Sequence, residues 1–322
     1  MIVGGSLGGL SAAYELKKAG RPVTVIEAHS RPGGRVFTTR KPFRDNLYCE
    51  MGAEYVDAGD KLLRQYCKEF DLKVLTARLY DAVVLRDNRF AMSDYKNKKV
   101  SLPYDGTTPG VLFGQERRYA ERLIKQIQDP NRLPPELLAL DNKSVAEVLL
   151  AEGAPQDVIS LYTYLNATER TARPDQMSAL SMIRSLHSVS GFNEEVDEGR
   201  ILGGNDQVSK ALARYLGHDV LYNRPVEQIR HGSDGVQVTF DENVKQRTIR
   251  GARLVIAMPF SVLRKLEIQP AFSAAKMKSI QSVSYGTVMK RAMQYDQRFW
   301  DEKGSLGQRV LTHTANGSAN FY

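Results

Sequence analysis

The sequence predicts an α/β fold with two domains, the first built around a parallel sheet and the second of mixed α+β type. Three observations support this fold class. The chain opens with a strand, a glycine turn, a helix and a second strand, and the stretch from about Asp60 to Arg200 has helical patterns broken by proline loops. Alternating, strand-like patterns follow Gly217. The 322 residues suffice for about two domains, each with its own core.

A βαβ-type unit is expected within the first 27 residues. Ile2 and Val3 are typical of a buried strand, and a glycine-rich turn follows them. The next residues predict a helix that Gly20 is placed to end. Val23–Ile26 has the β-branched composition of a second buried strand, and this strand ends at Glu27. Such a unit implies a parallel sheet. The helix places one apolar face at Leu10, Ala13 and Tyr14.

Two further helices are predicted from their caps and their apolar spacing. Ser144 and Glu147 have the S-x-x-E pattern of a capping box, and Gly153 can end the helix that they begin. A second helix is expected after Gly203–Asp206 and is closed by Gly217. Its apolar residues fall on one face: Val208, Ala211, Leu212, Tyr215 and Leu216.

The second half of the chain predicts strands. Val226–Arg230 and Val236–Phe240 flank turn residues and form a hairpin pattern, with Val236, Val238 and Phe240 alternating as in a half-buried strand. Leu254–Met258 is apolar without alternation, which predicts a strand covered on both faces, and Pro259 stops it.

Composition excludes several classes of protein. Hydrophobic residues make up 42% and charged residues 25%, as in an ordinary globular protein. No apolar run approaches the roughly 20 residues of a membrane helix, and no signal-peptide pattern opens the chain. We therefore expect a soluble, cytoplasmic protein without membrane contact. The 45 basic residues exceed the 37 acidic ones by eight, but they are scattered among acids, so no nucleic-acid partner is expected.

The two cysteines, Cys49 and Cys67, form neither a C-x-x-C pair nor a disulfide framework. They are expected to be core thiols in a reducing compartment rather than ligands or redox partners. The sequence predicts no metal site.

The glycine-rich turn Gly4–Gly9 is a candidate pyrophosphate site. The N-terminus of a helix presents unpaired N–H groups and the positive end of the helix dipole. Gly4 and Gly9 fit the first and third positions of G-x-G-x-x-G, and the middle position is Ser6. A serine side chain limits the approach of the backbone to a phosphate, although its hydroxyl could donate a hydrogen bond to a phosphate oxygen. A glycine turn without a ligand is the alternative.

Glu27 supports the interpretation that the glycine turn binds a nucleotide. It lies 23 residues after Gly4, at the end of the second strand. In Rossmann-like folds an acidic residue near this spacing accepts hydrogen bonds from ribose hydroxyls. The same negative charge would repel a 2′-phosphate, which disfavours an NADP-type ligand. The alternative is a solvated glutamate at a strand end.

The segment Arg31–Thr39 is the most discriminating part of the sequence. Its glycine pair adds backbone N–H groups, and Arg35 offers a guanidinium fork that matches phosphate geometry. The glycine turn, Glu27 and the R-x-G-G-R-x-x-T run together resemble the FAD-binding signature of the flavin-containing amine oxidases, which include monoamine, polyamine and L-amino-acid oxidases. This resemblance implies an FAD-binding set of Gly4, Ser6, Leu7, Gly8, Gly9, Glu27, Ala28, Gly34, Arg35, Gly52, Ala53, Glu54, Tyr55 and Val226.

Other segments match the family in the same order along the chain. Gly52–Tyr55 is similar to the segment that passes near the isoalloxazine ring, and Gly203–Asp206 resembles the run that returns the chain to the FAD domain. Val226 stands where the family has a valine whose backbone contacts the adenine. Tyr285–Lys290 with Phe299–Trp300 resembles the family's lysine segment, so Lys290 is the implied catalytic residue, holding a water near flavin N5. Phe299 and Trp300 are expected in the core. A surface lysine is the alternative for Lys290.

The resemblance implies a discontinuous Rossmann-like FAD-binding domain at residues 1–76 and 202–264. Residues 77–201 and 265–322 would form a substrate domain with a helical insertion and an antiparallel sheet. The implied reaction oxidises an amine to an imine by hydride transfer to flavin N5, with O2 reduced to H2O2. An L-amino-acid oxidase with the same chemistry is an alternative, and an NAD-linked dehydrogenase is another.

Two departures from the family pattern bear on function. The family continues to a C-terminal FAD segment that the sequence ending at Tyr322 does not contain, so a non-catalytic or partner-dependent FAD-binding subunit stays open. A homodimer or a complementing C-terminal polypeptide is then an expected partner, beside a small amine or amino acid and O2. Tyr55 also stands where L-amino-acid oxidases of the G-P-M-R type have an arginine for the substrate carboxylate, which favours a simple amine.

Overall fold

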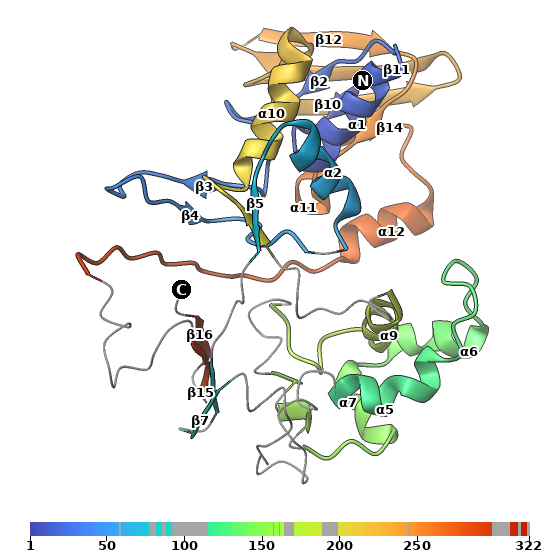
Figure 1. The fold of residues 1–322 in the computed structure, drawn as a ribbon. Coiled ribbons are helices and arrows are strands. Elements are labelled where there is room, and N and C mark those ends of the chain that lie inside the picture. Colours follow the sequence, from blue (N-terminus) through green and yellow to red (C-terminus); the bar gives the residue numbers. More distant parts are fainter. Residues whose placement is uncertain are drawn as a thin grey trace. The chain divides into compact units, whose positions relative to one another are not determined.

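The chain forms two compact units, which are described separately (Figure 1). Unit 1 comprises Met1–Ala77 and Asp197–Tyr285, and unit 2 comprises Arg78–Val196 and Gly286–Tyr322. The structure is a computed structural model, and it describes residues 1–57, 59–76, 82–85, 88–91, 115–156, 158–160, 162–163, 171–188, 199–243, 245–297, 310–314 and 317–320.

Unit 1 is organised around a parallel four-stranded sheet in the order β13-β1-β2-β9. Because β1 pairs in parallel with β2 on one side and with β13 on the other, the expected crossover topology is confirmed. Ile2, Val3 and Val25 are at most 1% exposed, so the centre of the sheet is fully buried. The strands are β1 (Ile2–Val3), β2 (Val25–Ile26), β9 (Val220–Leu221) and β13 (Val255–Ile256).

The prediction that Leu254–Met258 is a strand covered on both faces was wrong. Only Val255 and Ile256 form β13, and Val255 is 39% exposed. Within the described strands β13 pairs with β1 alone, so it is an edge strand. In this segment, an apolar composition without alternation therefore did not indicate a strand that is buried on both faces.

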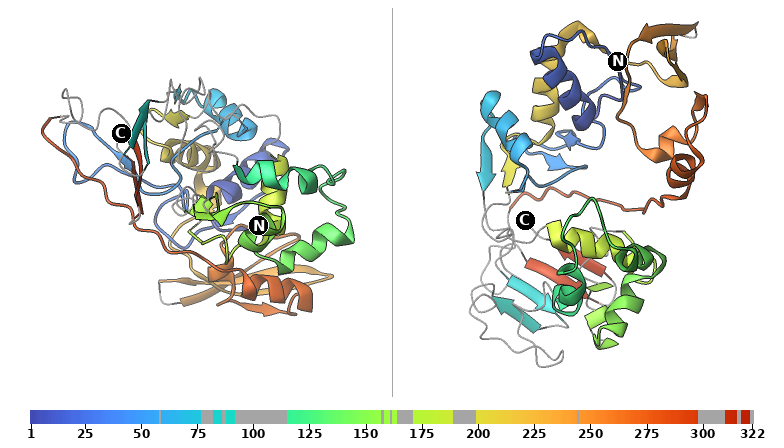
Figure 2. Two further views of the ribbon diagram at one scale, coloured as in Figure 1. Left: turned by 90° about the horizontal axis from the view of Figure 1, so that it is seen from below. Right: turned by 90° about the vertical axis from the view of Figure 1, so that its right-hand side faces the viewer.

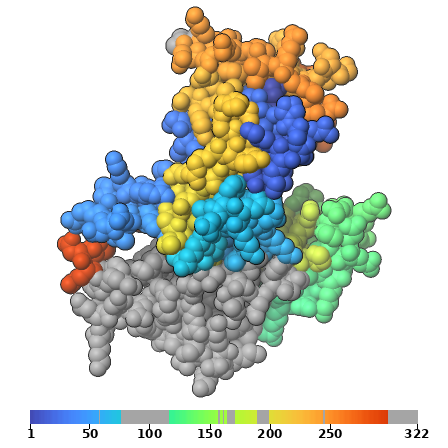
Figure 3. Space-filling model, turned by 45° about the horizontal axis from the view of Figure 1, so that its top comes forward, coloured from blue at the N-terminus to red at the C-terminus, as the bar shows by residue number. Residues whose placement is uncertain are grey.

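Two helices pack side by side next to this sheet, α1 (Leu7–Lys18) and α10 (Asp206–Leu216), as Figures 2 and 3 show in blue and yellow. Both were predicted from their spacing, and both end next to glycines with positive φ, Gly20 and Gly217. Together with α2 (Lys61–Glu69) they enclose one apolar core. Its fully buried members include Leu10, Ala13, Leu212 and Leu216.

Tyr215 differs from the expected buried face of α10. It is 46% exposed, and its ring packs edge-on against Tyr14 with centroids 4.8 Å apart. A tyrosine at the rim of the helix interface buries its ring edge while leaving the hydroxyl end near water.

A second sheet of unit 1 has the order β12-β11-β10-β14. The predicted hairpin is confirmed, because β10 and β11 pair antiparallel, with Ile229, Val238 and Phe240 buried. The elements are β10 (Val226–Gly232), β11 (Gly235–Glu242), β12 (Lys245–Gly251), β14 (Glu267–Gln269), α11 (Phe260–Leu263) and α12 (Ala274–Ser282). Two short antiparallel pairs complete unit 1: β3 (Thr38–Thr39) with β4 (Cys49–Glu50), and β5 (Val74–Thr76) with β8 (Gly199–Ile201).

Unit 2 contains a helical core and a small sheet. The predicted capping box is present: the Ser144 hydroxyl accepts from the Glu147 N–H at 3.1 Å, and the Glu147 carboxylate accepts from the Ser144 N–H at 2.7 Å. The sheet is mixed rather than antiparallel, because β15 pairs in parallel with β6. The elements are β6 (Ala82–Leu85), β7 (Asn88–Ala91), α5 (Gln115–Ile124), α6 (Pro135–Leu138), the 3-10 helix η1 (Ala139–Asn142), α7 (Val145–Ala151), α9 (Ala179–Ser188), β15 (Val310–Thr314) and β16 (Gly317–Asn320).

The two units divide after Ala77 and before Asp197, whereas the expected divisions lay after residues 76 and 201, and unit 1 ends at Tyr285 rather than at the expected residue 264. Residues 265–285 lie in unit 1 because β14 pairs with β10, and Arg264 donates to the carbonyl oxygen of Ile280 in α12 at 2.6 Å. The long-range pairing that decides this boundary leaves no local signal in the sequence. The assignment of the units to FAD and substrate binding is a prediction.

The two cysteines differ in burial. Cys67 is 1% exposed, and burial raises the pKa of its thiol, as expected of a core cysteine. Cys49 is only half-buried.

No helix in the part of the chain that the structure describes has both the length and the apolar composition needed to cross a bilayer.

Candidate functional site

The glycine turn between β1 and α1 is closely packed against the strand β13 region. Gly4 has a φ of 104°, and a Cβ there would lie 2.6 Å from the carbonyl oxygen of Ala257. A Cβ on Gly9 would lie 2.0 Å from the carbonyl oxygen of Gly4. Gly8, by contrast, has nothing within 4 Å of its Cβ position. The first and last glycines are thus required by the turn itself, while Gly8 faces open space.

Ser6 caps helix α1 rather than offering its hydroxyl proton to a ligand. Its Oγ donates to the carbonyl oxygen of Ala257 at 3.0 Å and accepts from the Gly9 N–H at 3.4 Å. The suggested donation from this hydroxyl to a phosphate oxygen is therefore not the arrangement observed. By helix geometry the N–H groups of Leu7 and Gly8 have no partner inside the helix, so these two donors are the ones available to an anion.

Glu27 lies against the glycine turn, as the nucleotide interpretation requires. Its carboxylate accepts from the Gly5 N–H at 2.6 Å and from the His29 N–H at 2.8 Å, and the residue is 6% exposed. The alternative of a solvated glutamate is thereby excluded. Since an ionised carboxylate has about four acceptor positions, the two backbone bonds leave capacity for ribose hydroxyls.

The second glycine pair lies beside the first. The Gly33 N–H donates to the carbonyl oxygen of Gly5 at 2.8 Å, and the Cβ position of Gly34 is 3.2 Å from that of Ser6. Arg31 fixes this loop from within, because its guanidinium donates to the carbonyl oxygen of Gly34 at 2.9 Å and stacks 4.4 Å over the Phe37 ring. The loop therefore adds backbone groups to the rim of the turn, and Arg35 is exposed.

A buried polar network joins β3 and β4 to helix α10, and the sequence analysis missed it. Glu50 accepts from the Asn205 N–H at 2.8 Å and from the Thr38 hydroxyl at 2.7 Å. Burial raises the pKa of Glu50. Asn205 also donates its amide N–H groups to the carbonyl oxygens of Ala53 and Glu54, at 3.1 and 2.9 Å. The G-G-N-D run was a signal for Asn205, but nothing local identified its partners.

Asp206 extends this network outward. Its carboxylate lies 2.7 Å from the Arg40 guanidinium and 2.6 Å from the Lys210 ammonium. Burial by itself would raise the pKa of Asp206, but the hydrogen bonds from Arg40 and Lys210 outweigh burial, so the pKa is lowered. Through Asn205, the network holds the carbonyl oxygens of Ala53 and Glu54.

Glu54 and Tyr55 meet Arg200 of strand β8. The Arg200 guanidinium lies 2.5 Å from a Glu54 carboxylate oxygen and 3.4 Å from the Tyr55 hydroxyl, and it stacks 5.0 Å over the Tyr55 ring. Arg200 was not among the predicted site residues.

Val226 opens strand β10 and is half-buried against the cluster that contains Val3 and Ile26. The structure thus places Gly4–Gly9, Glu27, Gly34 and Gly52–Tyr55 in unit 1.

Lys290, the predicted catalytic residue, lies in unit 2 in a stretch without helix or strand, and it is exposed. Its catalytic role is a prediction. Phe299 and Trp300 lie outside the described residues. No group of His, Cys, Asp or Glu side chains among the residues that the structure describes could hold a metal ion.

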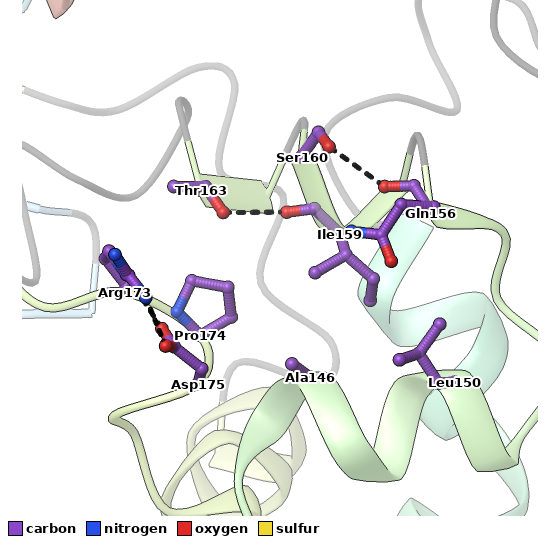
Figure 4. Close-up of a pocket in the computed structure, with 9 residues that line it drawn as sticks. All are labelled: Ala146, Leu150, Gln156, Ile159, Ser160, Thr163, Arg173, Pro174 and Asp175. Carbon is purple, nitrogen blue, oxygen red and sulfur yellow. Dashed lines mark hydrogen bonds and ion pairs between the residues drawn. The ribbon is translucent and has the colours of Figure 1, made fainter.

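Unit 2 has a pocket of about 380 Å³ that is lined by α7 and by Gln156, Ile159, Ser160, Thr163 and residues 173–175 (Figure 4). Four of its polar side chains are bonded locally: Ser160 and Thr163 donate to backbone carbonyl oxygens one turn earlier, and Arg173 pairs with Asp175. Ala146, Leu150, Ile159 and Pro174 supply the apolar part of its lining. The pocket brings together none of the predicted site residues.

Comparison with known proteins gives a consistent result. A family model described as flavin containing amine oxidoreductase matches residues 7–322. The L-amino-acid oxidases of Pseudechis australis and Daboia russelii are both 28% identical to this chain over 97% of its length, and the chain covers 60% and 62% of theirs.

Solved structures agree in fold. A putrescine oxidase variant with redesigned cofactor binding has a TM-score of 0.72 and 25% identity, and cyclohexylamine oxidase from Brevibacterium oxydans has a TM-score of 0.71 and 23% identity. Each match covers 87% of this chain and 62% of the other. The chain therefore spans about three fifths of the length of the relatives that it matches.

These matches confirm the predicted fold class and the predicted flavin cofactor, FAD. They also decide against the NAD-linked dehydrogenase, since nearly the whole chain matches a flavin-containing family. The chain belongs to the family of flavin-containing amine oxidoreductases.

Proposed function

We propose that this chain binds FAD in unit 1 and serves the oxidation of an amine to an imine, with O2 reduced to H2O2. The observation that carries the proposal is the position of the Glu27 carboxylate, buried against the Gly5 N–H of the glycine turn at 2.6 Å. A buried acceptor at this place, next to the N-terminus of α1, fits a ribose adjoining a diphosphate.

The residues present fit the cofactor in chemistry. The N–H groups of Leu7 and Gly8 would meet the diphosphate, and the absence of a side chain at Gly8, whose Cβ position meets nothing within 4 Å, leaves room for it. Glu27 would accept from the ribose, and Arg35 would place a guanidinium near the phosphate charge. The family resemblance adds the backbone of Ala28 and Val226 for the adenosine half and Gly52–Tyr55 for the flavin ring.

FAD, when bound, would supply the acceptor for a hydride equivalent from the carbon that bears the amine and the two electrons that reduce O2. The protein's contribution is to hold and orient both molecules. The network of Glu50, Asn205 and Asp206 fixes the segment before Tyr55, because its bonds reach the carbonyl oxygens of Ala53 and Glu54. Lys290 is proposed to hold a water that moves a proton during the reaction.

An L-amino-acid oxidase with the same chemistry is a second candidate, since L-amino-acid oxidases are among the curated relatives at 28% identity. A partner-dependent FAD-binding subunit is a third. The partner proposed for such a subunit is a complementing polypeptide or a second copy of the chain.

The test begins with the absorption spectrum of the purified protein after incubation with FAD and removal of free FAD. A retained flavin band is expected in wild type. The Glu27→Gln variant is expected to lose it, since one oxygen acceptor is replaced by a donor, while Glu242→Gln, which alters a carboxylate at an ion pair with Arg224, should retain it. Equal flavin retention in all three proteins would contradict the assignment of Glu27.

Peroxide release is then measured across matched amines and amino acids. Release with amines supports the first candidate, and release only with amino acids supports the second. Release that requires an added polypeptide supports the partner-dependent subunit. Unfolding curves of each variant separate loss of the cofactor from loss of the fold.

A further inference from the structure

The pocket of unit 2 has the size of a small-ligand site, and it contains none of the residues on which the proposed function rests (Figure 4). Its volume is about 380 Å³, and small-molecule sites in proteins span roughly 300–1,000 Å³. The lining combines apolar side chains of α7, Ala146 and Leu150, with hydroxyl, amide and charged side chains. Such a mixed lining is typical of sites that hold the apolar body of a small molecule and orient its polar end.

Backbone hydrogen bonds join the segments that line the pocket. The Ala146 N–H at the start of α7 donates to the Pro174 carbonyl oxygen at 3.1 Å. The neighbouring Val145 N–H donates to the Met177 carbonyl oxygen at 2.9 Å. Ile159 is 5% exposed and belongs to the apolar core of unit 2. The pocket is therefore formed by the fold of unit 2 itself.

Two hydroxyl groups of the lining can only accept hydrogen bonds from a ligand. Ser160 donates its proton to the Gln156 carbonyl oxygen at 3.0 Å, and Thr163 donates its proton to the Ile159 carbonyl oxygen at 2.9 Å. Because a hydroxyl has one proton and two lone pairs, each oxygen keeps acceptor capacity but has no proton left to donate. A ligand that bonds to both hydroxyls must therefore supply two protons.

The ion pair of Arg173 and Asp175 adds donors to the lining without adding net charge. The Nε of Arg173 donates to one carboxylate oxygen of Asp175 at 2.9 Å, and its Nη2 donates to the other. The bond from Arg173 lowers the pKa of Asp175, so the carboxylate is ionised near pH 7 and compensates the guanidinium. Within the described residues the Nη1 of Arg173 has no acceptor, so its N–H groups can donate to a ligand oxygen.

These groups match a neutral primary amide in their chemistry. The two N–H bonds of a carboxamide suit the Ser160 and Thr163 oxygens, and its carbonyl oxygen suits the free N–H groups of Arg173. A carboxylate brings no proton for the two hydroxyls and meets the negative charge of Asp175. An alkylammonium brings no acceptor for Arg173 and meets its positive charge. Both ions are therefore expected to bind more weakly than an amide of the same length.

We infer that this pocket is a binding site for a short aliphatic primary amide. The amide group lies at Ser160, Thr163 and Arg173, and the alkyl chain lies against Leu150 and Ile159. All residues of the lining belong to unit 2, so the inference does not depend on FAD binding in unit 1.

The test is a methyl NMR titration of the full chain with ¹³C-labelled isoleucine δ1 methyl groups. Ile159 lines the pocket and reports on its occupancy, whereas Ile183, buried in the core of unit 2 and outside the lining, is the internal reference. Their signals are assigned from the spectra of Ile159→Val and Ile183→Val. Pentanamide should cause a saturable shift of the Ile159 signal and leave the Ile183 signal in place.

Pentanoate and pentylammonium have the same number of carbon atoms as pentanamide and carry opposite charges. Each should bind at least about tenfold more weakly than pentanamide, measured from the same Ile159 signal. The absence of a saturable shift with pentanamide overturns the inference. An affinity for either ion that comes within tenfold of the affinity for pentanamide also overturns it.

Ser160→Ala removes one acceptor of the pocket and should weaken pentanamide binding about fivefold, because one N–H of the ligand loses its acceptor. Ser279→Ala is the matched control. Ser279 also donates to a carbonyl oxygen one turn earlier, that of Ala275 at 3.1 Å, but it lies on α12 in unit 1 and outside the lining. The control should leave the affinity unchanged, and equal affinities in the two variants overturn the inference.

A second variant and a reference signal keep the outcome interpretable. If Ser160→Ala does not fold, Thr163→Val replaces it, since valine has nearly the shape of threonine without the hydroxyl. The same weakening of about fivefold is expected, and unchanged affinity overturns the inference. An Ile183 signal at its wild-type position shows that the core of each variant is folded. Failure to bind FAD would contradict only the proposed function, whereas failure of pentanamide to shift Ile159 would contradict only this inference.

Discussion

The two units differ in what they bury. Among the described residues, the buried polar and charged ones all lie in unit 1, and they are Glu27, Thr38, Glu50, Asn205, Asp206 and Ser209. The helical core of unit 2 is built from apolar side chains such as Leu149, Met182 and Ile183, and its described ion pairs involve exposed side chains. Because a buried polar group costs free energy unless it is bonded, this difference marks unit 1 as the place where buried polar groups are held in a fixed arrangement.

The two units also offer examples of two kinds of hydrogen bond, one between residues far apart in the sequence and one within a single helix turn. In unit 1, Glu27 and Glu50 reach backbone N–H groups far away in sequence, Gly5 and Asn205. In unit 2, Ser144 and Glu147 bond to each other within one helix turn. Loss of a bond of the first kind is expected to disturb a ligand site, whereas loss of the second kind affects only a local helix.

The largest effect is expected from Gly9→Ala. The new Cβ would lie 2.0 Å from the Gly4 carbonyl oxygen, a backbone atom that no change of side-chain rotamer can move away. We expect a loss of about 3 kcal/mol or more in unfolding free energy, together with loss of flavin binding. Gly8→Ala is the matched control, since its Cβ meets nothing within 4 Å, and its unfolding midpoint should equal or exceed that of wild type. Equal urea midpoints for the two variants would contradict the packed turn.

Leu212→Ala and Leu149→Ala compare the two cores directly. Both leucines are 0% exposed, so each truncation should cost about 3 kcal/mol. Leu212 lies on α10 against α1 in unit 1, and its loss should also weaken flavin affinity, measured by fluorescence titration. Leu149 lies in unit 2 and should leave flavin affinity unchanged in the folded fraction. Weaker flavin affinity in Leu149→Ala together with unchanged affinity in Leu212→Ala would contradict a cofactor site in unit 1.

Asp206→Asn should cost about 1–2 kcal/mol near pH 7, because charge-assisted bonds to Arg40 and Lys210 are lost and Arg40 is partly exposed. The pKa of Asp206 is lowered from its ordinary value of 3.8, so this stabilisation is present above that value and disappears as the pH falls through the folded-state pKa. Urea unfolding at several pH values should show the difference from wild type shrinking in acid. Asp175→Asn in unit 2, at an exposed pair, should cause no measurable change. If the difference in unfolding free energy between Asp206→Asn and wild type did not change with pH, the ionised Asp206 carboxylate would not be the source of this stabilisation.

The smallest effect concerns helix caps, which act locally in both units. Ser144→Ala removes a complete capping box in unit 2 and should cost about 1 kcal/mol. Ser273→Ala in unit 1 removes a single cap bond of 3.4 Å and should cost less. Thermal unfolding measures both, and flavin binding should be unaffected in each. A larger loss in Ser273→Ala would show that bond length is a poor guide to cap strength here.

The sequence predicted the elements that depend on neighbours along the chain. The spacing of Leu10, Ala13 and Tyr14 gave α1, the S-x-x-E pattern gave the cap at Ser144, and alternation gave the hairpin of β10 and β11. The position of Glu27 after Gly4 predicted the carboxylate next to the turn. These features follow from periodicity, capping and strand direction, all of which are written within a few tens of residues.

The tertiary structure alone decided the partners that are distant in sequence. It assigned the Ser6 hydroxyl to Ala257, the Asn205 amide to the backbone of Ala53 and Glu54, and Arg200 to Glu54. It also left Val255 exposed at a sheet edge that local composition had suggested was covered. The reason is physical: burial and pairing depend on which segments meet after the chain has folded, and no local pattern of residues fixes that encounter.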